Sequence, residues 1–324
     1  MSLMAKRSRL RAAAVGLAIS LCLPALSASA DEAFITDQNA NAVSVLDLAA
    51  HKLVATIAVD GKPAGIAMAP DGSAAYVTSP EGPYVTVIDT ATRKIRSKIA
   101  VGKDPLGIAV DPSGRFLYVA DFDTPHVYKV DIKAGQVVGQ AQVGAAPCGV
   151  AITPDGKVIA VADRDDDQIT ILDAQSLKEI AAVKTGEHPF GLTIDAEGKR
   201  AYAADVKSNT VTVIDLAARK VIATVQTGLR PYVVAVNKTQ GFVTDEYAGT
   251  VTVFDISTFK PVTKINVGDY PEGIEFSPDG TQFYVANWFS DDVWAIDTAT
   301  LKVIAKMSVA DGPRSFGTFI RKTP

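Results

Sequence analysis

The chain has 324 residues, 21% of them charged, and a formal net charge of −4. Residues 1–30 contain four of the 32 basic residues and none of the 36 acidic ones, so residues 31–324 have a formal net charge of −8. This acidity argues against nucleic acid and anionic lipid as partners, and the single cysteine after residue 30, Cys148, excludes an internal disulfide there.

The first thirty residues have the layout of a secretory signal peptide. Residues 1–11 are basic, residues 12–23 are apolar, and Ala28-Ser29-Ala30 forms a small-x-small cleavage site. The apolar run is shorter than a comfortable membrane span. We expect cleavage after Ala30, a periplasmic or secreted location, no transmembrane segment in the mature chain, and one domain over residues 31–324.

The remainder repeats with a period of about 42 residues. Each unit has four short runs rich in Val, Ile, Ala and Tyr, separated by turn residues, which is typical of four strands. An aspartate that ends the third strand recurs at Asp47, Asp89, Asp131, Asp173, Asp215, Asp255 and Asp297. A proline that opens the innermost strand recurs at Pro63, Pro105, Pro147, Pro189, Pro231, Pro271 and Pro313. One such sheet cannot bury its own faces, so the units must pack on one another.

The two ends of the repeat array complement each other. The first unit begins with a second strand at Ala33–Asp37, and the last is followed by an extra innermost strand at Arg314–Ile320. Joining them removes the open edges of a linear stack. We therefore predict an all-β fold: a seven-bladed β-propeller of four-stranded antiparallel blades, closed by the C-terminal strand in the N-terminal blade.

The repeat also resembles a known family. The segments Tyr76-Val77-Thr78-Ser79 and Tyr284-Val285-Ala286-Asn287, with the recurring Val-Gly-x-x-Pro-x-Gly, are similar to the YVTN-type 40-residue β-propeller repeat family over Ala33 to about Ile320. The resemblance implies an exported bacterial or archaeal propeller. Family members include lactonases and a lyase, and some accompany quinoprotein or redox systems.

Candidate site residues flank the recurring prolines, because these positions vary while the scaffold around them repeats. In a propeller their loops converge at one mouth of the central channel, a usual ligand site. Drift at exposed loop positions is the equally weighted alternative. The candidates for ligand or partner binding are His188, Arg230, Tyr232, Glu272, Arg314 and the nearby Trp288. The arginines would attract an anionic group, Tyr232 would pack its apolar part, and Glu272 or His188 would orient it.

Aromatic residues cluster in the loops of the last units on the same side: Tyr232, Tyr247, Tyr270, Trp288 and Phe289. With Arg230 and Arg314 they could stack a flat or anionic ligand. Isolated exposed aromatic residues are normal, however.

A second variable ring ends the second strands: Asp37, Ser79, Asp121, Asp163, Asp205, Asp245 and Asn287. Hydrogen bonding within turns explains it better than a cation funnel. His126 and His188, with Asp121 or Asp163, are the alternative ligands for a divalent cation, although no short fixed spacing supports them. The chain has no C-x-x-C-H, so no covalently attached haem is expected, and we predict no cofactor.

These features favour an exported, non-catalytic binding propeller that is monomeric. It would hold a small ligand or a periplasmic partner, a quinoprotein or redox protein by the resemblance. The alternatives are a lactonase or lyase, implied by the resemblance, and a single-stranded nucleic-acid binder, against which the net charge speaks.

Overall fold

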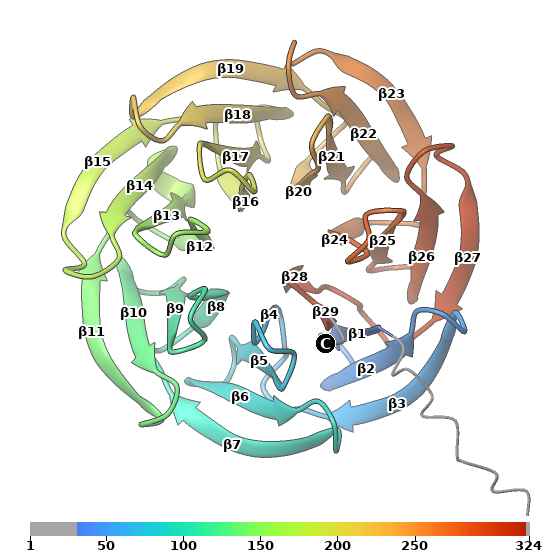
Figure 1. Cartoon of the computed structure of the whole chain (residues 1–324), viewed down its shortest axis with the longest axis horizontal. Helices are drawn as coiled ribbons and strands as arrows, with labels where there is room; N and C mark the ends of the chain where they lie inside the picture. The colour runs from blue at the N-terminus through green and yellow to red at the C-terminus, as the bar shows by residue number, and fades with distance from the viewer. Residues whose placement is uncertain (1–30, 322–324) are drawn as a thin grey trace, which may run out of the picture.

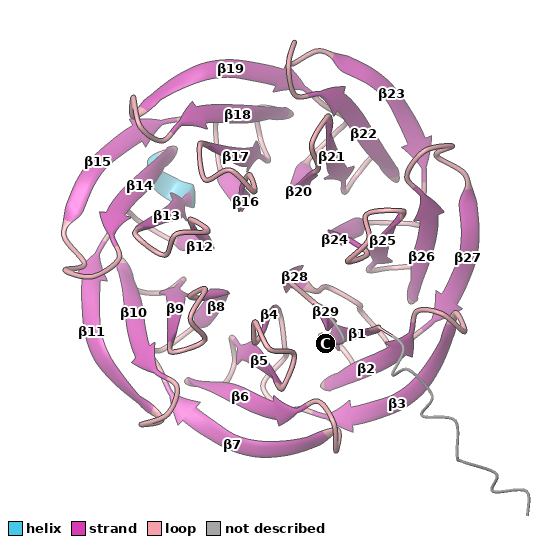
Figure 2. Cartoon of the chain, viewed as in Figure 1, coloured by secondary structure: helices cyan, strands magenta, loops and turns pink. Residues whose placement is uncertain are grey.

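The computed structural model describes residues 31–321, and in this range seven antiparallel sheets surround a central axis (Figure 1). Figure 2 shows that the described chain is almost entirely strand and turn, apart from one turn of 3₁₀ helix, η1 (Arg164–Asp166). The predicted all-β, seven-bladed propeller is confirmed. No helix in residues 31–321 is long and apolar enough to cross a membrane. The expected signal peptide lies outside the described residues.

Each blade is an antiparallel meander in which the four strands lie one outside the other, from the axis to the rim. Blade 1 contains β1 (Glu32–Asp37), β2 (Ala42–Asp47), β3 (Lys52–Ala58) and β29 (Ile320–Arg321). Blade 2 contains β4 (Gly65–Met68), β5 (Ala74–Ser79), β6 (Tyr84–Asp89) and β7 (Lys94–Ala100), with β28 (Phe316–Gly317) added at its inner edge. Blade 3 contains β8 (Pro105–Val110), β9 (Phe116–Asp121), β10 (His126–Asp131) and β11 (Gln136–Gln142).

The other four blades follow in chain order. Blade 4 contains β12 (Pro147–Ile152), β13 (Val158–Asp163), β14 (Gln168–Asp173) and β15 (Glu179–Lys184). Blade 5 contains β16 (Pro189–Ile194), β17 (Arg200–Asp205), β18 (Thr210–Asp215) and β19 (Lys220–Gln226). Blade 6 contains β20 (Pro231–Val236), β21 (Gln240–Asp245), β22 (Thr250–Asp255) and β23 (Pro261–Asn266). Blade 7 contains β24 (Pro271–Phe276), β25 (Gln282–Asn287), β26 (Asp292–Asp297) and β27 (Val303–Ser308).

The C-terminal segment closes the ring, as predicted, but it serves two blades. Ile320 and Arg321 pair with β1, and the Arg314 N–H donates to the Thr36 carbonyl at 2.8 Å. Between these contacts, Phe316 and Gly317 pair in parallel with β4 of blade 2. The segment therefore ties blade 1 to blade 2 across the junction, whereas the sequence predicted one continuous strand in blade 1.

Blades pack face to face, which explains why their strands are apolar on both sides. In blade 5, for example, the second and third strands are almost fully buried and the outer strand is largely exposed. A buried aromatic side chain sits at the recurring position of the second strand in most blades, as in Tyr118, Tyr202 and Tyr284. Large buried side chains between neighbouring sheets form the hydrophobic core, which stabilises the fold in place of disulfide bonds.

Close packing at the axis explains the recurring glycine two residues after the proline. A Cβ on Gly107 would lie 1.7 Å from the Cys148 carbonyl oxygen, and one on Gly191 would lie 2.2 Å from the Tyr232 carbonyl oxygen. Only glycine lets adjacent inner strands approach this closely.

The disc has two distinct faces. The proline face carries the loops between second and third strands and the loops that lead into the recurring prolines. The hairpin face carries the loops between first and second strands and the outer hairpins. All seven aspartates of the Asp47–Asp297 series accept main-chain N–H bonds within those outer hairpins, for example Asp215 from Ala218 at 2.7 Å. These aspartates therefore stabilise the outer hairpin turns.

Candidate functional site

At the proline face a side-chain plug fills the axis. It consists of the residues that follow the recurring prolines together with Phe316 from the closing segment. The ring of Phe190 lies 4.5 Å from that of Tyr232 and 4.9 Å from that of Phe316, centroid to centroid. Leu106, Cys148 and Ala64 complete the apolar part of this layer. The side chains at these variable positions therefore pack against one another at the axis.

The polar part of the plug joins three of the sequence candidates. The Arg314 Nε lies 3.1 Å from a carboxylate oxygen of Glu272, and an Arg314 Nη donates to the Tyr232 hydroxyl. A second Nη donates to Gln38 at 3.0 Å. The Glu272 side chain is only 5% exposed and that of Arg314 is 19% exposed. Burial raises the pKa of Glu272 to about 7, even though the Arg314 charge opposes this shift.

Arg230 is also paired with a carboxylate and a tyrosine hydroxyl, but at the surface. Its Nε lies 3.1 Å from Glu246 and an Nη donates to the Tyr247 hydroxyl at 3.0 Å. Its guanidinium carbon lies 4.3 Å from the centre of the Tyr247 ring. The two arginines predicted to attract an anion therefore each face a carboxylate of this chain.

A continuous aromatic patch, defined as Tyr247, Tyr270, Trp288 and Phe289, covers the proline face of blades 6 and 7. Tyr270 lies at its centre, with its ring 5.2 Å from Tyr247 and 4.3 Å from Phe289. Trp288 and Phe289 are 4.7 Å apart. Tyr247 is 52% exposed and Phe289 is 57% exposed. The aromatic clustering predicted from the sequence is present, except that Tyr232 belongs to the plug.

His188 and His126 are not brought together. His188 precedes Pro189 in the loop into blade 5, where its N–H donates to Asp167 at 2.8 Å, and burial together with Arg164 lowers the pKa of its ring. His126 begins β10 of blade 3 and stacks on Tyr128, so blade 4 lies between the two histidines. Within residues 31–321, no group of three or more His, Cys, Asp or Glu side chains is arranged to hold a metal ion.

The ring at the ends of the second strands binds its own loops. Asp245 accepts bonds from the Gly228 N–H at 2.9 Å and from Thr252 at 2.6 Å, and Asp205 accepts from Thr210 and Thr212. A Cβ at Gly228 would lie 2.5 Å from the Asp245 carboxylate. This explains the recurring glycine three residues before the prolines, and it confirms hydrogen bonding as the role of these aspartates.

Blade 1 breaks this pattern at Asp37. The glycine is replaced by Ala310, whose N–H points to the Ser44 hydroxyl at 3.4 Å instead of to the carboxylate. Asp37 is completely buried. Burial raises its pKa to about 8; Ser44 opposes the shift, and Asp291 and Asp311 add to it.

We expect Asp37→Asn to change the pH dependence of stability. The folded pKa of about 8 exceeds the ordinary 3.8, so the folded state holds a proton that the unfolded chain releases. The contribution of the protonated Asp37 carboxyl to the stability of the fold is complete at low pH and is lost as the pH rises toward 8. From pH 6 to pH 9 the variant should gain about 1 to 3 kcal/mol relative to the wild type in urea unfolding. Asn287 shows that an amide fits this position in blade 7. Parallel pH profiles would contradict the assignment.

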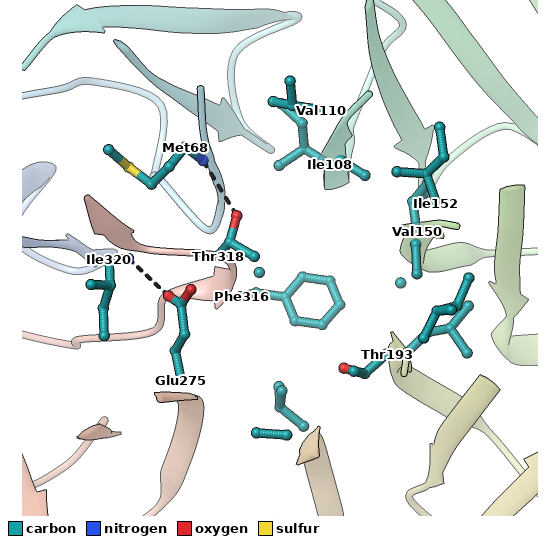
Figure 3. A pocket seen from close by; sticks show the side chains of 18 of the residues that line it. Met68, Ile108, Val110, Val150, Ile152, Thr193, Glu275, Phe316, Thr318 and Ile320 are labelled. Atoms are coloured by element: carbon teal, nitrogen blue, oxygen red, sulfur yellow. Dashed lines mark hydrogen bonds between the residues drawn. The ribbon is translucent and has the colours of Figure 1, made fainter. Parts of the chain in front are cut away.

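An open cavity lies on the other side of the plug. It has a volume of about 690 Å³, is lined by the inner strands, and opens on the hairpin face. Figure 3 shows Phe316 at its base and Met68, Ile108, Val150 and Ile152 on its wall. The candidate binding residues predicted from the sequence lie at the other mouth, on the proline face. The inward aliphatic residues of the first strands were the available signal for this cavity.

Two family models match the chain. One, described as the cytochrome D1 heme domain, matches residues 106–315, and the other, described as a YNCE-like beta-propeller, matches residues 5–115. No curated protein matches the chain.

Solved propellers share this fold. Hydrazine synthase of Kuenenia stuttgartiensis superposes with a TM-score of 0.72 and 23% identity, covering 79% of this chain and 89% of the other. A functionally unknown protein of Desulfotomaculum acetoxidans gives 0.80 and 14%, covering 91% and 100%. The periplasmic gluconolactonase PpgL of Pseudomonas aeruginosa gives 0.76 and 18%, covering 91% and 99%. At these identities the likeness is one of fold.

Proposed function

The chain belongs to the cytochrome D1 heme domain family, and we propose that it is an exported, non-catalytic propeller that binds a basic protein partner on its proline face. The mature protein would be residues 31–324 as one domain, released from the predicted signal peptide and located in the periplasm or outside the cell. The aromatic patch carries this proposal.

The family description raises the question of haem. Haem iron takes its axial ligand from His, Cys, Met or Tyr, and of these the described part of the cavity lining contains only Met68. The described lining also has no Lys or Arg to pair with the carboxylates of a haem. At the proline face Phe190, Tyr232 and Phe316 occupy the axis. These residues do not fit a haem on the axis, so the proposed function does not depend on one.

The aromatic patch has the composition of a protein interface. Tyr, Trp, Phe and Arg are enriched at the centres of such interfaces and supply most hot spots. Arg230 borders the patch and is held in place by Glu246 and Tyr247. The rings already contact one another, so little side-chain entropy remains to be lost on binding.

The charge of the proline face indicates the chemistry of the partner. Acidic residues outnumber basic ones in its loops. The acidic ones are Asp60, Glu81, Asp104, Asp123, Asp165, Asp166, Asp167, Glu187, Glu246, Asp269, Asp291 and Asp311; the basic ones are Lys62, Lys103, Arg164, Lys207, Arg230 and Arg314. Asp269 and Asp291 lie directly beside the aromatic patch. A partner with a basic rim around an apolar centre is complementary to this surface.

A small anionic ligand is less well supported than a protein. Arg314 is inside the plug against Glu272, and Arg230 is paired with Glu246, so an incoming anion would have to displace a carboxylate from either arginine. The lactonase or lyase alternative is supported by the likeness of fold to a gluconolactonase. No catalytic cluster in residues 31–321 has been identified for it.

Site-specific photocrosslinking tests the proposal. A photoreactive phenylalanine at position 289 should capture one basic partner in the source cells, and the same group at Val262, an exposed position on outer strand β23, should not. With the purified pair, Tyr247→Ala and Phe289→Ala should each weaken binding about tenfold or more, and added salt should slow association. Equal capture from both positions, or an acidic partner whose association rate does not change with salt, would refute the proposal.

A further inference from the structure

We propose that the hairpin-face cavity is a separate binding site for one neutral, mainly hydrocarbon small molecule. The proposal is independent of the partner surface, which lies on the opposite face. It rests on the shape of the cavity, its lining, and the state of its few polar groups.

The cavity has the size and enclosure of a ligand site. Its volume of about 690 Å³ falls within the range of roughly 300–1,000 Å³ usual for small-molecule sites. The plug closes its inner end, so it is a blind pocket and not a through-channel. Phe316 forms part of both: its ring packs against Phe190 in the plug, and it is one of the residues that line the cavity (Figure 3).

The wall is aliphatic on every side. Successive inner strands contribute Met68, Ile108, Val110, Val150, Ile152 and Leu192, and Val234, Val236 and Ile274 continue the wall through blades 6 and 7. Covering such a surface with hydrocarbon removes apolar area from water on both partners, at about 25 cal/mol per Å².

The polar side chains of the lining are already engaged with the protein. Thr193 donates to the Val234 carbonyl at 2.5 Å, and Thr318 accepts the Met68 N–H at 3.3 Å. A Glu275 carboxylate oxygen accepts the N–H groups of Phe319 and Ile320 at 2.5 and 2.8 Å (Figure 3). Among the described residues that line the cavity there is no Lys or Arg to pair with an anion. The site thus favours a ligand with an apolar, uncharged surface.

Prolines mark the rim of the cavity in four blades. Pro70, Pro112, Pro154 and Pro278 line the mouth at equivalent positions, and the turn glycines of the following blades, Gly114 and Gly156, lie against Pro70 and Pro112. In blade 6 the corresponding loop has only three residues between β20 and β21, against five in the neighbouring blades. This lowers the rim there and gives a ligand a way in.

A neutral fluorescent probe, N-phenyl-1-naphthylamine, tests the site on the full-length mature protein. We expect saturable binding of one molecule, displaced by decan-1-ol and not by decanoate at the same concentration. Ala151→Trp, on the wall in blade 4, should reduce probe affinity at least about tenfold. The matched Ala145→Trp, exposed at the proline-face end of the same blade, should leave it unchanged.

Each result is decisive. If Ala151→Trp does not fold, as judged by circular dichroism, Ala109→Trp on the blade 3 wall takes its place. Absence of probe binding, equal affinity in the wall variant and the control, or loss of binding in Ala145→Trp alone would overturn the site. Equal displacement by decanoate would overturn the ligand class. Tyr247→Ala should not affect the probe, so failure here is distinct from failure of the partner surface.

Discussion

Deletion of residues 314–324 should abolish cooperative folding. The deletion removes Phe316, Phe319 and Ile320, which are 4%, 0% and 3% exposed, and leaves β1 and β4 without their inner neighbours. Truncating one buried phenylalanine to alanine already costs about 3–5 kcal/mol, and typical domains are stable by about 5–15 kcal/mol. The loss therefore exceeds what the fold can absorb, and thermal unfolding should show no cooperative transition.

Two milder variants keep this prediction quantitative. Phe319→Ala removes one ring from the junction of blades 1 and 7, and should lower the free energy of unfolding by about 3–5 kcal/mol. Leu53→Ala, at an exposed position on the outer strand of blade 1, should change it by less than about 1 kcal/mol. A truncated protein that melts at the wild-type temperature would show that the ring does not need this closure.

The repeat phase was enough to predict the blades, their number and their closure, because each blade obeys the same local rules. It did not predict which end of the channel is open. That depends on the side chains after the prolines, where Tyr232 and Phe190 are large enough to reach the axis and Ala64 and Cys148 are not. Variation at these positions has the same appearance in a sequence whether the residues bind a ligand or fill a centre.

The departure at Asp37 could have been found from the sequence with a pairing rule. In blades 3 to 7 the residue that ends the second strand is matched by a glycine in the loop into that blade, such as Gly228 with Asp245. Blade 1 keeps the aspartate but has Ala310. The rule itself follows from a contact between segments 17 residues apart, which strand patterns alone do not reveal.

Arg314→Met should destabilise the protein in a pH-dependent way. The substitution keeps the bulk but leaves Glu272 buried without its ion partner, which typically costs about 3–5 kcal/mol. Arg230→Met is the matched control, because that pair is partly exposed, with 42% of the arginine side chain accessible, and should cost about 1 kcal/mol or less.

The direction of the pH effect follows from the pKa of Glu272. Its folded value of about 7 is above the ordinary 4.5, so wild-type stability from this group declines as the pH rises from about 4.5 to about 7 and is then constant. Without the Arg314 charge the folded pKa rises further, and the decline continues above pH 7. In urea unfolding the deficit of Arg314→Met should therefore be larger at pH 9 than at pH 6. The double variant Arg314→Met, Glu272→Gln should remove this difference between the two pH values. A deficit that is the same at both pH values would mean that Arg314 does not hold the Glu272 charge, and that the plug is stabilised by packing alone.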